Sequence, residues 1–368
     1  MNGRMKNIIT PAKGIAPRYS RKRVTRAGNA IREGISTPED FLILENWRAS
    51  HAHVINTFQA NLRRRTRGTD FLVGQRLKRR VTIEDKLIRH PGMNLARMHD
   101  IAGCRVIFPD VKSMLDFREK FNSSRSKHER ITAKRDQFNY LNNPKTTGYR
   151  GIHDVYKYDS FAASAAQWNG LSIEVQYRTR AQHAWATAVE IADLLTKSRG
   201  KFSNDDNNYM NFFRVCSEIL ARHEEDLNSC YPKKFRHELL ELYDKCTEEL
   251  NILEILSRNT VIGREHIQGV FKKGLNTLLI YPYDQVENSF LLETKSIKST
   301  RQALEQYEEA EKEWAGKADV VLVRAEDTDV LRKVFQNYFA DSSDFVKYVS
   351  RGLRKMRRLE ANPITHLL

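Results

Sequence analysis

The sequence predicts an α+β protein with two domains, the second smaller than the first. A chain of 368 residues exceeds what one hydrophobic core usually fills. Short runs that alternate apolar and polar residues, as strands do, lie between longer runs of helical period. The composition becomes strand-rich again from about Thr260. We therefore expect a flexible basic arm over residues 1–34, a first domain over 35–258 and a C-terminal α+β domain over 259–368.

The first 69 residues are expected to form the arm and a long helical segment. Lys and Arg are frequent in the arm, which is expected to become helical near Ser20. The next pattern runs from Thr37 to Thr69, with Pro38 as a suitable first helical residue and acidic residues after it. Its apolar residues recur at helical spacing, which predicts one long helix or two packed ones.

A strand followed by a helix is predicted over Phe71–Arg89. Arg76 and Lys78 alternate onto one face of the strand, and Lys86 lies on the helix, which Thr82 is expected to head. A helix N-terminus with several cations nearby is a plausible cradle for a polyphosphate. A charged segment that simply faces solvent is the alternative.

Two further strands combine an apolar face with a polar one. In Met98–Asp110, Arg105 lies on the face that its apolar neighbours do not use. In Leu171–Arg180 the side chains of Ile173, Val175 and Tyr177 alternate with those of Glu174, Gln176 and Arg178. Polar side chains along one face of an otherwise apolar strand indicate a site, because burying them without partners is costly.

The loop Asn139–Val155 has the composition of a nucleotide-binding loop. Lys145 offers a cation for phosphate, Tyr149 an aromatic face for a base, and His153 a further polar group, with Gly148 and Gly151 between them. Loops of this composition also occur in proteins that bind no ligand.

Helices with apolar residues at core spacing follow the last of these strands. From Thr260 we expect two strands around a turn at residues 282–288, a helix over Thr300–Trp314, a strand at 318–325 and two helices, Asp327–Phe339 and Ser343–Met356.

Composition limits the partners. A net charge of +16 calls for an anionic partner such as a nucleotide or nucleic acid. No run approaches the ~18 apolar residues of a membrane span, and no signal-peptide core is evident. The four cysteines lack the close spacing of metal sites, so reduced thiols, a cytoplasmic location and no membrane partner are expected.

Taken in order, these blocks resemble the synthetase domain of the RelA/SpoT homologue family, over about residues 40–200. The similar blocks are Arg76-x-Lys78 with Lys86, Asp100-Ile-x-Gly103-x-Arg105-Val, Asn-Pro-Lys145-x-x-Gly148-Tyr149-x-x-Ile-His153 and Glu174-Val-Gln-x-Arg178-Thr. The resemblance implies a mixed β-sheet flanked by helices, related to nucleotidyltransferases. It also implies transfer of the β,γ-pyrophosphate of ATP to the 3′-hydroxyl of GDP or GTP, which makes the alarmone (p)ppGpp.

The resemblance also implies a role for each matching residue. Asp100 and Glu174 would hold Mg²⁺, and Glu174 would help to deprotonate the attacking hydroxyl. The ATP-binding residues would be Arg76, Lys78 and Lys86 at the phosphates and Arg105 at the adenine. Tyr149 would stack on guanine, Lys145 and His153 would contact the acceptor, and Gln176 and Arg178 would orient it.

Several alternatives remain open. The two carboxylates could instead form core salt bridges, Asp100 with Arg105 and Glu174 with Arg178. A toxin-type member would modify the 3′ end of tRNA or an adenine nucleotide, for which a basic arm is suited. A protein of another class would be a catalytically silent nucleotide sensor or nucleic-acid-binding module. No alarmone hydrolase domain is expected, and self-association into a homo-oligomer stays open.

Overall fold

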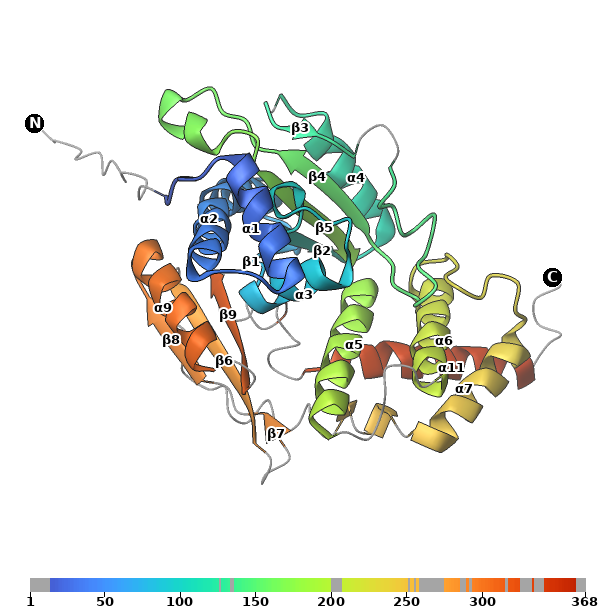
Figure 1. Cartoon of the computed structure of the whole chain (residues 1–368). Helices are drawn as coiled ribbons and strands as arrows, with labels where there is room; N and C mark the ends of the chain where they lie inside the picture. Colours follow the sequence, from blue (N-terminus) through green and yellow to red (C-terminus); the bar gives the residue numbers. More distant parts are fainter. Residues whose placement is uncertain are drawn as a thin grey trace, which may run out of the picture.

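The computed structural model contains two β-sheets and the helices that cover them (Figure 1), which confirms the α+β class. It describes residues 14–125, 127–132, 136–199, 207–250, 252–254, 256–257, 275–284, 289–290, 293–314, 317–324, 333 and 341–361. No helix within these ranges is long and apolar enough to cross a membrane.

The larger sheet has five strands in the order β1-β2-β5-β4-β3. Their bounds are β1 Leu72–Leu77, β2 Ala102–Phe108, β3 Glu129–Arg130, β4 Ile152–Lys157 and β5 Ser172–Thr179. β2 and β5 are parallel, whereas the other neighbouring pairs are antiparallel. The mixed sheet flanked by helices is thereby confirmed.

The two faces of this sheet differ in polarity, as the alternating strand patterns predict. Helices α2 (Pro38–Thr66) and α4 (Val111–Asn122) cover the apolar face, where Phe108 of β2 packs on Phe117 of α4. On the other face, Arg105 lies opposite Gln176 in the pairing of β2 with β5, and Gly103 lies opposite Glu174. The polar side chains of β2 and β5 therefore share one face.

The helices before β1 are more ordered than expected. α2 is one helix of 29 residues, and Thr37 and Asp40 form the capping box at its start. α1 (Arg21–Glu33) begins close to the expected Ser20, but it packs on α2 through Val24 and Ala27, both fully buried. This part of the chain is therefore a packed helix and not a flexible arm, while residues 1–13 lie outside the described residues.

Helix α3 (Arg80–Arg89) begins two residues before Thr82, so the predicted start is wrong. Its N-cap residue, Arg79, provides no side-chain hydrogen bond to the helix. The N–H of Arg80 instead donates to Glu311, from a helix 231 residues further along the chain. A local search for a capping residue could not find this acceptor. Two 3₁₀ segments, Leu95–Arg97 and Ala163–Trp168, complete this part of the fold.

A second core lies between helices α5 (Arg180–Arg199), α6 (Asn207–Glu224), α7 (Arg236–Leu250) and α11 (Ser343–Ala361). Figure 1 shows α11, in red, crossing beside α5 and α6. The crossing is close at Gly352, where an added Cβ would come within 2.4 Å of Ile219. Glycine is thus needed for α11 to lie against α6.

The smaller sheet contains β6 (Asn276–Asp284), β7 (Ser289–Phe290), β8 (Glu293–Ile297) and β9 (Ala318–Arg324), with α9 (Thr300–Glu313) against it. β6 pairs with each of the other three strands. Pro282 lies inside β6, opposite Ala318, so the turn predicted from this position is wrong there. Residues 285–288 and most of the helix expected over 327–339 lie outside the described residues.

Both cores include residues from beyond position 259. Leu278 and Tyr307 belong to the core under the larger sheet, whereas Phe345 and Val349 belong to the core between the helices. The smaller sheet with α9 and the helix α11 thus pack on different parts of the first 258 residues. This differs from the separate C-terminal domain that the change in composition predicts.

Candidate active site

Asp100 lies just before β2 and is held by two lysines. The Nζ atoms of Lys78, after β1, and Lys86, on α3, are each 2.9 Å from Asp100 Oδ2. Burial favours the neutral acid, but the two ammonium groups outweigh it and lower the pKa of Asp100. Its other oxygen, Oδ1, is buried and has no hydrogen-bond partner among the described residues. Asp100 is therefore an ionised carboxylate with one oxygen free to bind a ligand.

Glu174, on β5, is the second ionised carboxylate. His153 Nδ1, on β4, is 2.9 Å from Glu174 Oε1, and both side chains are less than one-fifth exposed. Burial would favour neutral forms of both groups, but their mutual attraction lowers the pKa of Glu174 to about 2 and, with Tyr149, raises that of His153 to about 9. Lys78 also lowers the pKa of Glu174, so this lysine lies near both carboxylates.

Tyr149 links His153 to the cations of the site. Its hydroxyl oxygen is 2.5 Å from His153 Nε2 and accepts hydrogen bonds from Arg178 at 3.2 and 3.0 Å. Burial raises the pKa of Tyr149, but Arg178 and His153 outweigh it and bring it down to about 8. Lys145 Nζ lies 5.2 Å from the centre of the Tyr149 ring. The aromatic side chain is thus surrounded by positive charge.

Gln176 joins Glu174 to Arg105. Its Nε2 donates to Glu174 Oε2 at 2.7 Å, and its Oε1 accepts from Arg105 Nε at 3.3 Å. Burial, with Arg178 nearby, lowers the pKa of Arg105 to about 10. Arg76, on β1, lies opposite Gly103 and adds to the positive charge near Arg105 and Lys78.

The loop before β4 is held in place by the second core. Gly148 has φ +92°, and an added Cβ would approach Ser217 to 3.0 Å and Trp185 to 3.2 Å. Ser217 Oγ, on α6, donates to the Gly148 carbonyl oxygen at 2.5 Å. The loop also closes on itself through the hydrogen bond from Gly148 N to Lys145 O. Lys145 and Tyr149 therefore have positions fixed by α6.

These contacts bring together the residues that the sequence singles out. They are Arg76, Lys78, Lys86, Asp100, Arg105, Lys145, Tyr149, His153, Glu174, Gln176 and Arg178. Neither salt bridge of the alternative interpretation forms, because Asp100 pairs with Lys78 and Lys86, and Glu174 pairs with His153. The individual roles of these residues stay predictions.

Two further residues, Tyr140 and His99, lie next to the site but are not among the residues predicted for it. Lys145 Nζ lies 4.6 Å from the centre of the Tyr140 ring, which meets the rings of Tyr149 and His153 edge to face. His99 is close enough to both carboxylates for each to act on its pKa, which burial lowers. Tyr140 lies within the predicted loop and His99 precedes Asp100, so proximity in sequence is the signal that could have found them.

The donor set fits a hard divalent cation. Mg²⁺ prefers oxygen ligands and keeps several waters, so two carboxylates suffice for it. Asp100 Oδ1 is a buried acceptor without a partner, and Glu174 is ionised. The described residues contain no cluster of three or more His, Cys, Asp or Glu side chains that could hold a metal ion.

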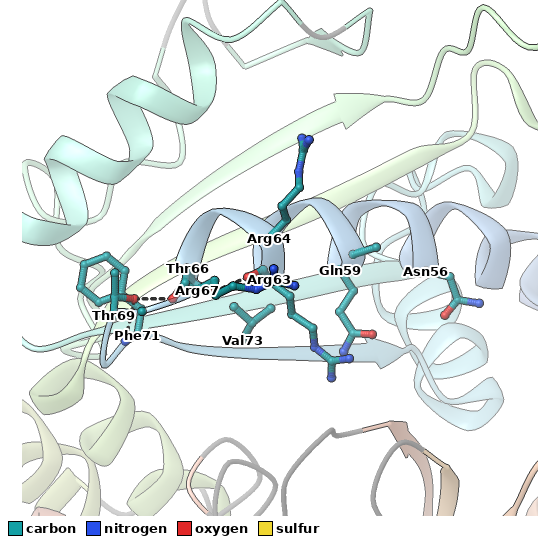
Figure 2. A pocket seen from close by; sticks show the side chains of 11 residues that line it. Asn56, Gln59, Arg63, Arg64, Thr66, Arg67, Thr69, Phe71 and Val73 are labelled. Carbon is teal, nitrogen blue, oxygen red and sulfur yellow. Dashed lines mark hydrogen bonds between the residues drawn. The ribbon is translucent and has the colours of Figure 1, made fainter. Parts of the chain in front are cut away.

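A cavity of about 520 Å³ lies elsewhere, at the end of α2 and the start of β1 (Figure 2). Its lining includes Gln59, Arg63, Arg67 and Val73, and none of the predicted site residues. Val73 pairs with Val106, on the face of the sheet that α2 covers. This cavity and the candidate active site are therefore on opposite faces of the sheet.

Fold and site together define an α+β domain that gathers carboxylates and cations on one face of a mixed sheet, an arrangement suited to phosphate-bearing ligands. Residues 75–200 match the family model described as a region found in RelA / SpoT proteins, so this chain carries a RelA/SpoT domain. Every predicted site residue falls within the matched range.

The chain is also similar to individual proteins and solved structures. Uncharacterized proteins of Mycobacterium tuberculosis and Mycobacterium bovis are 27% identical over 176 residues, which is 48% of this chain and 59% of theirs. Small alarmone synthetase 2 from Bacillus subtilis is similar over 48% of this chain and 89% of its own, with 19% identity and a TM-score of 0.38. The structure of small alarmone synthetase 1 from the same organism, bound to its product pppGpp, is similar over 51% of this chain and 93% of its own, with 24% identity and a TM-score of 0.39.

Proposed function

We propose that this protein is a pyrophosphokinase that transfers the β,γ-pyrophosphate of ATP to the 3′-hydroxyl of GDP or GTP and makes (p)ppGpp. The observation that supports it most is the meeting of Asp100 and Glu174, both ionised, with Arg and Lys side chains on one face of the sheet. The RelA/SpoT domain supports the same reaction class. Phosphoryl-group transfer depends mainly on positioning and charge neutralisation, which such a site provides.

In the proposed reaction the 3′-hydroxyl oxygen attacks the β-phosphorus of ATP and gives its proton to Glu174, while the bond from that phosphorus to the α-phosphate oxygen breaks and AMP leaves. Arg76, Lys78 and Lys86 neutralise the phosphates, and Arg105 stacks on the adenine. Lys78 and Lys86 already lie at Asp100. The phosphate cations and the first carboxylate are thus arranged before substrate binds.

Asp100 and Glu174 are the residues that would hold Mg²⁺, which when bound would neutralise phosphate charge. Glu174 is ionised, so its carboxylate would also accept the proton of the attacking hydroxyl.

On the acceptor side, Tyr149 stacks on guanine, and Gln176 and Arg178 orient the nucleotide. Lys145 and His153 contact its ribose or phosphates. Lys145 lies over the ring of Tyr149, so its ammonium group would move toward phosphate as the base stacks there. Arg178 Nη1 is buried without a hydrogen-bond partner among the described residues, which suits an anionic acceptor.

The test is incubation of purified protein with γ-³²P-ATP and Mg²⁺, with GDP, GTP, ADP and bulk tRNA offered in parallel. Label on a guanine nucleotide is the expected result. Glu174→Gln should lower that transfer at least about 100-fold, because it removes the charge but little of the shape. Glu129→Gln is the matched control, since Glu129 is exposed on β3 of the same sheet, and it should keep full activity.

Other outcomes decide between the alternatives. Label on tRNA or ADP would replace the guanine acceptor and support the toxin-type reaction. No transfer to any acceptor would favour a nucleotide sensor. A fully active Glu174→Gln variant would overturn the role given to Glu174.

A further inference from the structure

Helix α9 touches the proposed ATP-binding segment through one carboxylate. Glu311 Oε1 accepts a hydrogen bond of 3.2 Å from the backbone N–H of Arg80, the first residue of α3. The first N–H groups of a helix lack partners within the helix and carry its positive dipole end. Glu311 therefore caps α3, the helix that carries Lys86, from a distant part of the chain.

The same carboxylate reaches Lys78 through Arg48 of α2. Arg48 Nη1 is 2.8 Å from Glu311 Oε2, and Arg48 Nε donates a 2.8 Å hydrogen bond to the Lys78 carbonyl oxygen. Glu311 thus acts on both sides of the turn between β1 and α3, at Lys78 through Arg48 and at Arg80 directly. Because Lys78 Nζ contacts Asp100, this chain of contacts runs from Glu311 to the candidate active site.

The charged side chains of Arg48 and Glu311 are buried, so neither can exchange its partner for water. Arg48 is 2% exposed and Glu311 9% exposed. The guanidinium lies 4.5 Å from the centre of the Tyr307 ring on α9, and Glu45 is its second carboxylate partner at 2.9 Å. A buried ion that loses its partner is strongly destabilised. The turn between Lys78 and Arg80 is therefore fixed by α9 as well as by its own sheet.

We infer that Glu311 is a positioning residue for the proposed reaction: through Arg48 and the N-terminus of α3 it sets Lys78 and Lys86 at the ATP phosphates. This inference rests on the proposed function. It gives α9 and the smaller sheet a specific task, which is to hold the ATP side of the site. The acceptor side is held by another helix, because Ser217 of α6 fixes the loop that carries Tyr149, so Glu311 should affect ATP and not the acceptor.

The variant to test is Glu311→Gln, which keeps an oxygen for the Arg80 N–H but removes the charge that faces Arg48. Its KM for ATP should rise about tenfold, while the KM for the guanine nucleotide stays within about twofold. Glu309→Gln is the matched control, because Glu309 is an exposed residue of the same helix. It should behave as the unmodified protein does.

A purely structural role predicts a different pattern. Loss of fold lowers the active fraction and so reduces kcat with both KM values unchanged; this result, or an unchanged KM for ATP, would overturn the inference. Should Glu311→Gln not fold, Glu311→Asp retains the charge on a shorter side chain and should raise the KM for ATP to a smaller extent.

Direct titration of ATP with Mg²⁺ separates the inference from the proposed function. Weaker ATP binding by Glu311→Gln, without pyrophosphate transfer by the unmodified protein, would support the positioning role and overturn the transfer reaction. Equal ATP binding by both proteins would overturn the positioning role alone. An unmodified protein that binds no ATP would overturn both.

Discussion

At the scale of single residues, His183 is an imidazole kept neutral beside two guanidinium groups. It is 3% exposed on α5, and its Nε2 lies 2.9 Å from the Lys333 carbonyl oxygen. Burial first, and then the charges of Arg105 and Arg178, hold its pKa well below 6.5. A proton on His183 would add a third positive charge next to the two arginines of the site.

This arrangement predicts that the protein loses stability in mild acid. The unfolded chain binds a proton at His183 below pH 6.5 and the folded chain does not, so the free energy of unfolding falls as pH drops from that value. The limiting slope for one group is about 1.4 kcal/mol per pH unit. Urea unfolding at pH 7, 6 and 5 would measure it.

The variant His183→Gln should have a smaller slope between pH 6 and 5, because glutamine can donate a hydrogen bond to the Lys333 carbonyl and does not titrate. His237→Gln is the control, since His237 is exposed on α7. Equal slopes for His183→Gln and the unmodified protein would mean that His183 does not contribute to acid sensitivity.

At the scale of elements, the loop before β4 depends on one backbone conformation. Gly148 combines a φ of +92° with contacts from Ser217, Trp185 and the Arg214 backbone within 3.3 Å of an added Cβ. We expect Gly148→Ala to lower the free energy of unfolding by about 2–3 kcal/mol and to raise the KM of the acceptor, because Tyr149 is displaced. Denaturant unfolding and acceptor kinetics would measure the two effects.

Gly68 provides a matched control for this change. Its φ is +80°, but no atom lies within 4 Å of an added Cβ. Gly68→Ala should therefore cost only the backbone strain, about 1 kcal/mol, with unchanged acceptor kinetics. If the two variants lose the same stability, the contacts with α6 do not hold the loop.

Sequence patterns were sufficient for the main strands of the larger sheet and for the face on which the predicted site residues lie. The alternation along β5 places Glu174 and Gln176 on the face opposite Val175, and the glycines of the loop mark its unusual backbone. Such signals are local, because a strand or a turn is largely specified by its own residues. Their mutual contacts, such as His153 with Glu174, follow from the strand register, which a single sequence does not specify.

Long-range contacts explain what the sequence could not predict. The start of α3 depends on Glu311, and the C-terminal residues divide between two cores because Tyr307 and Phe345 pack on different helices. Composition near residue 260 changes as it would at a domain boundary, but composition does not reveal which surface a later helix covers. Tertiary packing, and not local propensity, decided these points.

At the scale of the whole molecule, helix α11, the last described element, is linked to the acceptor side of the site through helix α6. Phe345 is fully buried between α6 and its neighbours, with ring centres 6.4 Å from Phe212 and 6.0 Å from Phe213. Helix α6 also carries Ser217, which holds the Gly148 carbonyl oxygen. Packing of α11 should therefore influence the acceptor loop through α6.

Phe345→Ala should lower the free energy of unfolding by about 3–5 kcal/mol, as a large buried side chain is replaced by a cavity. Because α11 packs in one core with α5 and α6, calorimetry should show the main transition of the protein shift as a unit. Under conditions where the variant is folded, its KM for the acceptor should rise and its KM for ATP should not. Lys347 is exposed on the same helix, so Lys347→Ala should leave the free energy of unfolding and both KM values unchanged. A second, separate transition that alone shifts in Phe345→Ala would instead mean that the C-terminal residues unfold as an independent domain, and the link from α11 to the acceptor loop would then be wrong.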